Sequence, residues 1–302
     1  MTARELFIGA GGRLRAPWRL LLFFAVLSVV AKVVAAAAWP LIGAVAREWG
    51  VASSAFYWLA LLSLIGAHGI MIAGVDRTPW SAAWLGRDAL AGTLLARGLL
   101  LGCLAIGVPS LLLLSVGWLR AEPAAAGSWA VSAGRMAATL VPAAFAEELM
   151  LRGYVLAVLR EWWGWRAALM GTSVAFGLLH LPNPGSSAQS VTLVVLAGLF
   201  LGLVVLVTRS LYAAGLAHFA WNFTMAAALH TPVSGLPVDT PGYRVVDAGP
   251  DWATGGVWGP EGGALAAAGM LVGGWYLLAS RDRARALGEP MARLASREEP
   301  GS

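Results

Sequence analysis

Residues 190–207 read SVTLVVLAGLFLGLVVLV, a run of eighteen residues without a charged side chain. As an α-helix this run is about 27 Å long, which matches the hydrocarbon core of a bilayer. Seven more apolar segments occur along the chain. The segments that we expect to cross the membrane are 18–40, 52–75, 92–118, 131–158, 166–181, 190–207, 211–230 and 261–279. The sequence therefore predicts an all-α fold, a polytopic membrane bundle of about eight helices.

The composition supports a membrane protein and argues against a nucleic-acid-binding one. Hydrophobic residues make up 59% of the chain and charged residues 12%, whereas a soluble domain carries roughly 25% charged residues. The formal net charge is +5, which alone would be compatible with binding to nucleic acid. The basic residues, however, sit at the ends of the apolar segments, as membrane topology requires. We therefore expect membrane lipid around the protein and no nucleic-acid partner.

The arginines also predict the orientation of the helices. If the N-terminus is cytoplasmic and the segments alternate, only four arginines fall on the outer side, namely Arg47, Arg120, Arg135 and Arg244. This bias follows the positive-inside rule and predicts that both termini are cytoplasmic. The frequent Ala, Gly, Arg and Trp residues suggest a bacterial protein, so we expect a multi-pass protein of the bacterial inner membrane.

Three regions are expected along the chain. Residues 1–130 hold the cytoplasmic N-terminus and the first three membrane helices, and residues 131–230 hold the core that carries the polar motifs. Residues 231–302 hold an outer loop, the final membrane helix and a cytoplasmic tail. The outer loop, 231–260, is rich in Gly and Pro and contains two tryptophans. It is interpreted either as a plain connector or as a lid over the bundle.

A pair of glutamates inside an apolar segment is the first candidate for chemistry. Residues 145–154 read FAEELMLRGY, and a charged side chain at the bilayer centre costs about 2.5–3.5 kcal/mol on insertion scales. Glu148 and Arg152 are four residues apart, so they share a helix face and can pair. Glu147 points about 100° away from that pair. A salt bridge explains Glu148 and Arg152 but leaves Glu147 free for chemistry.

Two more segments bring polar side chains into the membrane. His180 lies four residues after Phe176 and just before Pro182, and His218 lies four residues before Asn222. Each residue has an ordinary interpretation, since a lone histidine is often a core residue and an asparagine often joins two helices. Together, a carboxylate, two imidazoles and an amide are the components of a site that activates water. We expect the three segments to converge.

These motifs, in this order, resemble those of the CAAX proteases and bacteriocin-processing enzymes, the Abi-type intramembrane proteases. That family has a double glutamate with an arginine four residues later, matched by Glu147, Glu148 and Arg152. Its second motif is matched by Phe176 and His180, and its third by His218 and Asn222. The motif-bearing core spans roughly 131–230, and the first three helices and the outer loop add no motif.

The resemblance implies an intramembrane endopeptidase and assigns roles to the matched residues. Glu147 with His180 would activate a water, His218 and Asn222 would stabilise the oxyanion, and Glu148 with Arg152 would hold the site together. Phe176 is expected to pack. The alternative is a metalloprotease in which His180 and His218, with Glu147 or Glu148, hold a zinc ion that polarises the water. The sequence is compatible with both versions.

Two other functions compete with proteolysis. One is a non-catalytic membrane scaffold or bacteriocin-immunity protein that binds a partner, although a scaffold has no need of Glu147. The other is a transporter or channel, which would predict repeats and broken helices in both halves; the sequence has no convincing repeat. For the protease, the expected partner is a peptide or membrane-protein substrate. Neither the substrate nor the oligomeric state follows from the sequence.

Overall fold

The structure is a computed structural model that describes residues 6–9, 12–49, 51, 54–238 and 241–280. The expected cytoplasmic tail after Ser280 lies outside the described residues. The fold is mostly helical, as predicted. Its long helices are α2 (Ala16–Glu48), α3 (Ser54–Gly69), α4 (Gly92–Ser115), α5 (Trp129–Arg152), α6 (Tyr154–Leu179), α7 (Ala188–Thr208), α8 (Leu211–Phe223) and α10 (Ala264–Ala279). These eight helices correspond in order to the eight apolar segments of the sequence.

Four of the described helices are long and apolar enough to cross a membrane. They are Ala16–Glu48, Ser54–Asp76, Gly92–Ser115 and Ala188–Thr208, where the second joins α3 to the π-helical turn η1 (Ile70–Asp76). The helix α10 is apolar but has only 16 residues. The structure thus supports a multi-pass membrane protein, while the count of eight spans and the cytoplasmic termini stay predictions.

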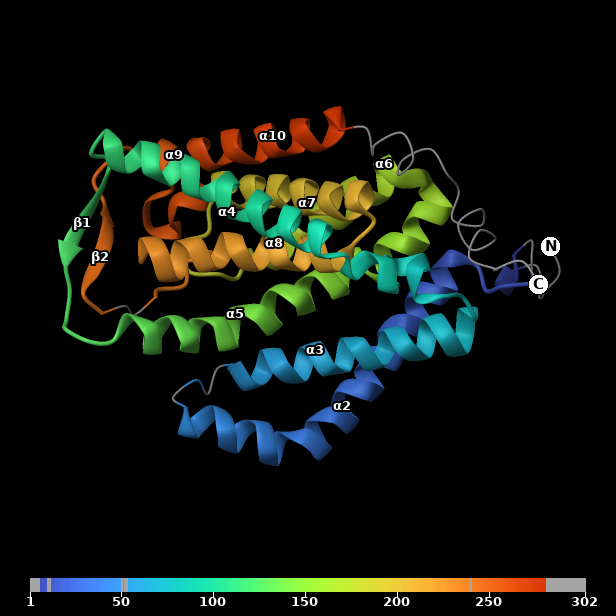
Figure 1. Ribbon diagram of the computed structural model, residues 1–302. Coiled ribbons are helices and arrows are strands. Elements are labelled where there is room, and N and C mark those ends of the chain that lie inside the picture. The colour runs from blue at the N-terminus through green and yellow to red at the C-terminus, as the bar shows by residue number, and fades with distance from the viewer. Residues whose placement is uncertain (1–5, 10–11, 50, 52–53, 239–240, 281–302) are drawn as a thin grey trace.

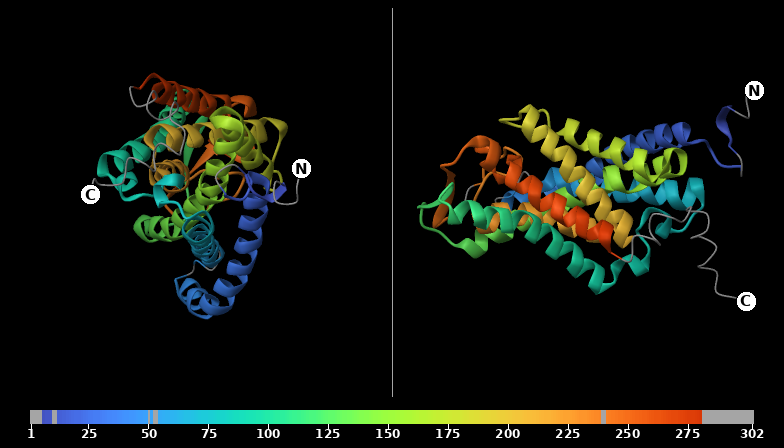
Figure 2. Two further views of the ribbon diagram at one scale, coloured as in Figure 1. Left: turned by 90° about the vertical axis from the view of Figure 1, so that its right-hand side faces the viewer. Right: turned by 90° about the horizontal axis from the view of Figure 1, so that it is seen from above.

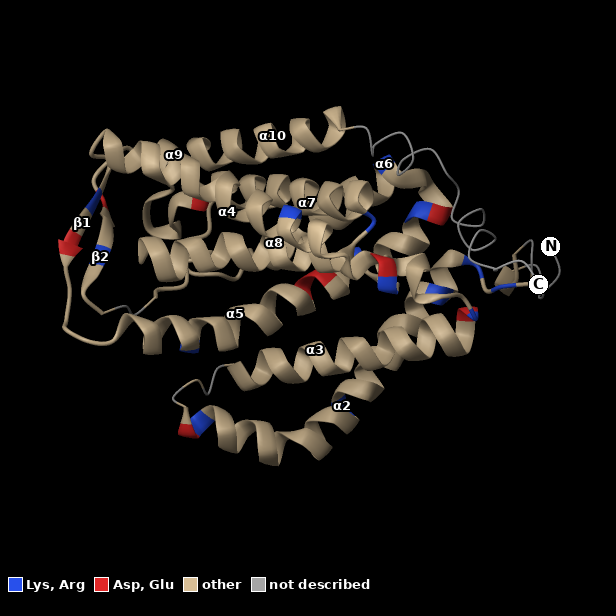
Figure 3. Cartoon of the chain, viewed as in Figure 1, with Lys and Arg blue, Asp and Glu red and all other residues tan. Residues whose placement is uncertain are grey.

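The helices run roughly side by side in one bundle (Figure 1). End-on and top views show α2 at the periphery and α8 among α4, α5 and α7 (Figure 2). Lys, Arg, Asp and Glu gather mainly near the helix ends, and the acidic patch on α5 is an exception inside the bundle (Figure 3). This distribution is the one expected for helices surrounded by lipid, because charged groups are costly within the hydrocarbon layer.

Short elements connect the helices at the two ends of the bundle. They comprise the 3-10 helices η2 (Trp80–Ala83), η3 (Arg87–Leu90), η5 (Gly256–Trp258) and η6 (Pro260–Gly262), the π-helical turn η4 (Thr224–Leu229) and the four-residue helix α9 (Asp251–Thr254). The strands β1 (Leu119–Pro123) and β2 (Tyr243–Asp247) pair antiparallel. This small sheet was not predicted. It joins two loops that are distant in the sequence, and their pairing leaves no periodic signal.

The fourth and fifth segments divide differently from the prediction. The helix α5 ends at Arg152 rather than near residue 158, because Gly153 has non-helical dihedrals of φ −78° and ψ −119°. A Cβ atom at Gly153 would lie 2.3 Å from Nε2 of His68 on α3. That nitrogen accepts a hydrogen bond from the backbone N–H of Tyr154, at 3.0 Å. His68, to which the sequence assigned no role, therefore orders the junction between α5 and α6.

A second buried polar cluster holds the same junction. Arg19 of α2 pairs with Asp76 at the end of η1 and, at 2.5 Å, with Glu161 of α6. The hydroxyl of Tyr154 donates to Asp76 at 2.8 Å. The sequence suggested only a topological role for Arg19, yet its side chain is buried. These contacts tie α2 and α3 to the start of α6.

The helices α4 and α8 cross with their backbones in contact. A Cβ atom at Gly102 of α4 would lie 1.9 Å from the carbonyl oxygen of Ala217, and one at Gly98 would lie 2.1 Å from that of Ala213. Small residues spaced four apart on both helices permit this approach. The crossing matters for function because α8 also carries His218.

We expect Gly102→Ala to destabilise the bundle by about 1–3 kcal/mol, the usual cost of adding atoms to a packed core. The added methyl group must push α8 away from α4. The measurement is the unfolding midpoint of the purified protein in detergent. Gly107→Ala on the same helix is the matched control, because its Cβ atom would make an ordinary contact of 3.7 Å with Thr224. Equal unfolding midpoints for both variants would contradict the inference that the close contact between α4 and α8 at Gly102 stabilises the bundle.

Candidate functional site

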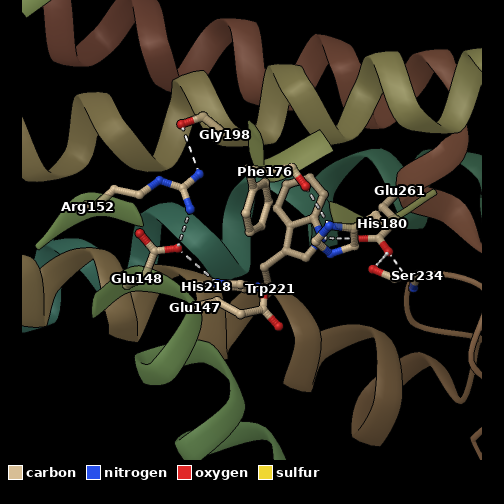
Figure 4. A network of polar contacts seen from close by, with 10 residues as sticks. All are labelled: Glu147, Glu148, Arg152, Phe176, His180, Gly198, His218, Trp221, Ser234 and Glu261. Carbon is tan, nitrogen blue, oxygen red and sulfur yellow. Dashed lines mark hydrogen bonds and ion pairs between the residues drawn. The ribbon is translucent and has the colours of Figure 1, made fainter. Parts of the chain in front are cut away.

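The predicted pair of Glu148 and Arg152 is present at the end of α5. Nη1 of Arg152 lies 3.3 Å from Oε1 of Glu148, and both side chains are 0% exposed. Nη2 of Arg152 also donates to the carbonyl oxygen of Gly198 on α7, at 3.3 Å (Figure 4). This pair therefore joins α5 to α7 at a place with no access to water.

Phe176 of α6 lies at the centre of the motif residues. The guanidinium of Arg152 stands over its ring at 4.2 Å from the centroid. The ring centroid of His180 is 4.7 Å away and that of His218 is 5.8 Å away. Phe176 thus packs against one residue from each motif, and the guanidinium gains a favourable cation–π contact.

His218 on α8 connects the two glutamates of α5. Its Nδ1 lies 3.1 Å from Oε1 of Glu148, and since an ionised carboxylate only accepts, Nδ1 carries the proton and donates. Its Nε2 faces Oε2 of Glu147 at 3.8 Å, which is too long for a direct hydrogen bond. The structure therefore brings the first and third motifs together.

Glu147 differs from Glu148 in its access to solvent, whereas the Oε2 atom of each glutamate is buried without a hydrogen-bond partner among the described residues. The side chain of Glu147 is 37% exposed. Glu147 is therefore separate from the pair that Arg152 neutralises, as the helix geometry predicted. It is less deeply buried than its place in an apolar segment suggested.

His180 and Asn222 line a small cavity together with His218. The volume of this cavity is about 30 Å³, enough for one or two water molecules. Nδ1 of His180 lies 2.8 Å from the carbonyl oxygen of Phe176, so Nδ1 donates and Nε2 remains available as an acceptor. The second and third motifs thus converge on one cavity.

One expected contact is missing from this arrangement. Glu147 and His180, predicted to share a water, are not hydrogen-bonded to one another, and Glu147 does not line the cavity. Both approach His218, since Glu147 faces its Nε2 and His180 shares the cavity with it. Glu147 and His180 therefore do not line a common water site in this structure.

Three cavity residues with hydrogen-bonding side chains were missed by the sequence analysis. They are Trp221, Ser234 and Glu261, which line it with the motif residues. Glu261 is the first residue of the last expected segment, 261–279, so the rule that singled out Glu147 could have identified it. Trp221 and Ser234 carry no such signal.

The alternative of a zinc ion needs three protein side chains placed together as ligands. Among the residues that the structure describes, no three His, Cys, Asp or Glu side chains lie close enough together to hold a metal ion. Glu148 is engaged by Arg152 and His218. The steps proposed below therefore use the side chains of the chain, and the metalloprotease alternative stays a prediction.

A wider groove lies along α5 on the side of the bundle that holds the β-sheet. Its volume is about 890 Å³. Its lining includes Tyr57, Ser132, Arg135, Leu140 and Ala143, together with residues of the loop segments 125–128 and 233–238 and Pro241. Ala143 is one helical turn before Glu147 and on the same face. The groove therefore leads along α5 toward Glu147.

Comparison with protein families supports the resemblance of the motifs. Residues 129–224, about a third of the chain, match the family model described as Type II CAAX prenyl endopeptidase Rce1-like. The matched segment contains all of the predicted site residues and ends before Ser234 and Glu261. No curated protein and no solved structure matched the chain.

Proposed function

We propose that the protein is an intramembrane endopeptidase, because residues 129–224 match the family model described as Type II CAAX prenyl endopeptidase Rce1-like. Its reaction is the hydrolysis of a peptide bond by a water that Glu147 and His180 activate. Its substrate is a peptide or a membrane protein that approaches from the bilayer. The expected location is the bacterial inner membrane.

The observation that carries this proposal is the environment of Glu147. Its Oε2 has no hydrogen-bond partner among the described residues and faces Nε2 of His218 at 3.8 Å. The neighbouring Glu148 is held by Arg152 and His218. Oε2 of Glu148 is likewise without a partner, so the property that sets Glu147 apart is its 37% exposed side chain. That exposure gives water access to Glu147, as a general base requires.

The proposed reaction assigns a step to each residue. Glu147 takes a proton from the water while the water oxygen bonds to the scissile carbonyl carbon. Asn222 and a doubly protonated His218 donate hydrogen bonds to the oxyanion that forms. The carbon–nitrogen bond then breaks, and the leaving amine receives the proton from Glu147. His180 holds the water through its free Nε2, and substrate binding is expected to bring Glu147 and His180 to the same water.

The groove along α5 supports an extended substrate. Its lining is mainly small or apolar, with Arg135 as its charged member. From Arg135 to Glu147 the helix rises about 18 Å, which corresponds to roughly five residues of an extended peptide. We infer that the substrate lies along α5 with its scissile bond beside Glu147.

Asn222→Ala is expected to lower kcat by about 100- to 1,000-fold, the usual effect of removing one oxyanion donor. KM should change little, because the donor acts on a charge that forms after binding. The measurement is the hydrolysis of an internally quenched peptide that spans the cleavage site of the wild-type protein. Thr192→Ala on the exposed side of α7 is the control. An unchanged kcat would show that Asn222 does not donate a hydrogen bond to the oxyanion.

The experiment that tests the function compares protein termini in cells that produce the protein and in cells that lack it. New termini in the membrane and secreted fractions of producing cells would establish proteolysis and identify the substrate. If stably inserted protein creates no new terminus in its native host, the scaffold or immunity alternative gains support over the protease.

A further inference from the structure

Glu261 is a carboxylate that three donors hold at the edge of the apolar bundle. It lies in η6, directly before α10. Its Oε2 accepts a hydrogen bond from Nε1 of Trp221 at 2.8 Å. Its Oε1 accepts two hydrogen bonds from Ser234, from the backbone N–H at 2.5 Å and from the hydroxyl at 2.8 Å. One side chain thus joins α8, the segment after η4 and the start of α10.

The residues that Glu261 holds belong to the wall of the catalytic cavity. Trp221 precedes Asn222 on α8, and its indole is buried. Trp221, Ser234 and Glu261 line the same cavity as His180 and Asn222, and Figure 4 shows these three residues together with His180. A displacement of Ser234 or Trp221 would therefore change the shape of the space in which the water and the oxyanion are expected to lie.

The segment around Ser234 covers the cavity and is anchored on both sides. Nδ2 of Asn183, from the loop that follows His180, donates to the carbonyl oxygen of Ser234 at 3.0 Å. The backbone N–H of Gly235 donates to the carbonyl oxygen of Trp258 at 2.9 Å. The outer loop is thus folded against the site rather than extended away from it. Glu261 is the charged residue that holds the segment around Ser234 in this position.

A carboxylate is well suited to this position. It accepts hydrogen bonds at both oxygens and donates none, so it satisfies all three donors at once. Hydrogen bonds to a charged acceptor are roughly twice as strong as neutral ones. A glutamine of the same shape would direct its NH₂ group against either the indole N–H or the donors of Ser234, and one anchor would be lost.

We propose that Glu261 is a positioning residue of the active site, which clamps Trp221 and the segment 232–236 over the cavity formed by His180, His218 and Asn222. This inference rests on the proposed function for its catalytic meaning. The clamp holds the Asn222 donor in place and limits the cavity to one or two waters. A misplacement of about 1 Å in such a site is enough to lower the rate about 100-fold.

Glu261→Gln tests the clamp with two measurements on the full-length protein. Hydrogen exchange of peptides that cover residues 231–238 should become at least tenfold faster, because the N–H of Ser234 loses its carboxylate. For the quenched cleavage-site peptide, kcat should fall about 10- to 100-fold while KM stays within threefold. A role in folding alone would instead reduce the amount of inserted protein without changing kcat per folded molecule.

Glu122→Gln is the matched control, because Glu122 is an exposed carboxylate of β1 that pairs with Arg244 at 3.2 Å. It should leave the exchange of residues 231–238 and kcat unchanged. The inference is overturned if Glu261→Gln behaves like Glu122→Gln in either measurement. If Glu261→Gln does not insert, Trp221→Phe replaces it, since it removes the Nε1 donor while keeping an aromatic ring at that position. A kcat within twofold of wild type for that variant likewise overturns the clamp.

The same two measurements distinguish a failure of the proposed function from a failure of the inference about Glu261. Glu147→Gln should abolish hydrolysis without altering the exchange of residues 231–238. If Glu147→Gln remains active, the proposed mechanism is wrong, while the exchange measurement still decides whether Glu261 holds the cover. If Glu147→Gln is inactive and Glu261→Gln is unaffected, only the inference about Glu261 is wrong.

Discussion

Glu147→Gln is expected to abolish peptide-bond hydrolysis and to leave the protein folded and inserted in the membrane. Glutamine has the shape of glutamate but does not accept a proton from water, so the general base is lost. A general base contributes roughly 100- to 10,000-fold to a rate. The fold should tolerate the change because no described residue donates a hydrogen bond to the inner oxygen of Glu147.

The measurement combines new protein termini in cells with hydrolysis of the quenched cleavage-site peptide by purified protein. Glu122→Gln makes the same chemical change on the exposed β1 strand and should retain full activity. Full activity of Glu147→Gln, with normal amounts of inserted protein, would show that another group activates the water. Loss of activity together with loss of inserted protein would instead assign Glu147 a role in folding.

Arg152→Leu is expected to have the largest effect on stability. Arg152 and Glu148 are both fully buried and lie 3.3 Å apart, so removing the guanidinium leaves a buried carboxylate with His218 as its remaining partner. Breaking a buried ion pair in this way costs about 3–5 kcal/mol. The carbonyl oxygen of Gly198, inside α7, loses its side-chain donor as well. We expect a large drop in the unfolding midpoint in detergent and little inserted protein.

The double variant Glu148→Leu with Arg152→Leu provides the control. Replacing both members of a buried ion pair by apolar residues is often neutral or stabilising, so the double variant should recover at least half of the lost stability. It should remain inactive, because His218 loses the carboxylate that orients it. A wild-type midpoint for Arg152→Leu would mean that the pair contributes little to the fold.

Much of the architecture and most of the candidate site could be predicted from the sequence. Apolar segments of about 20 residues predict membrane helices because the backbone must satisfy its own hydrogen bonds in lipid. The spacing of Glu148 and Arg152 predicts their pairing because residues four apart share a helix face. The high cost of buried charge made Glu147 a candidate for function before its neighbours were known.

Contacts between distant parts of the chain could not be predicted in this way. The spacing of His218 and Asn222 places them on one face of α8, but the tight crossing at Gly98 and Gly102 fixes where that face points. The clamp at Glu261 joins residues 27 and 40 positions away. Periodicity within a segment reports only which side chains share a face. The angles and separations at which helices pack depend on every small residue along their crossings, so the cavity, its cover and the relation of Glu147 to His180 became visible only in the folded chain.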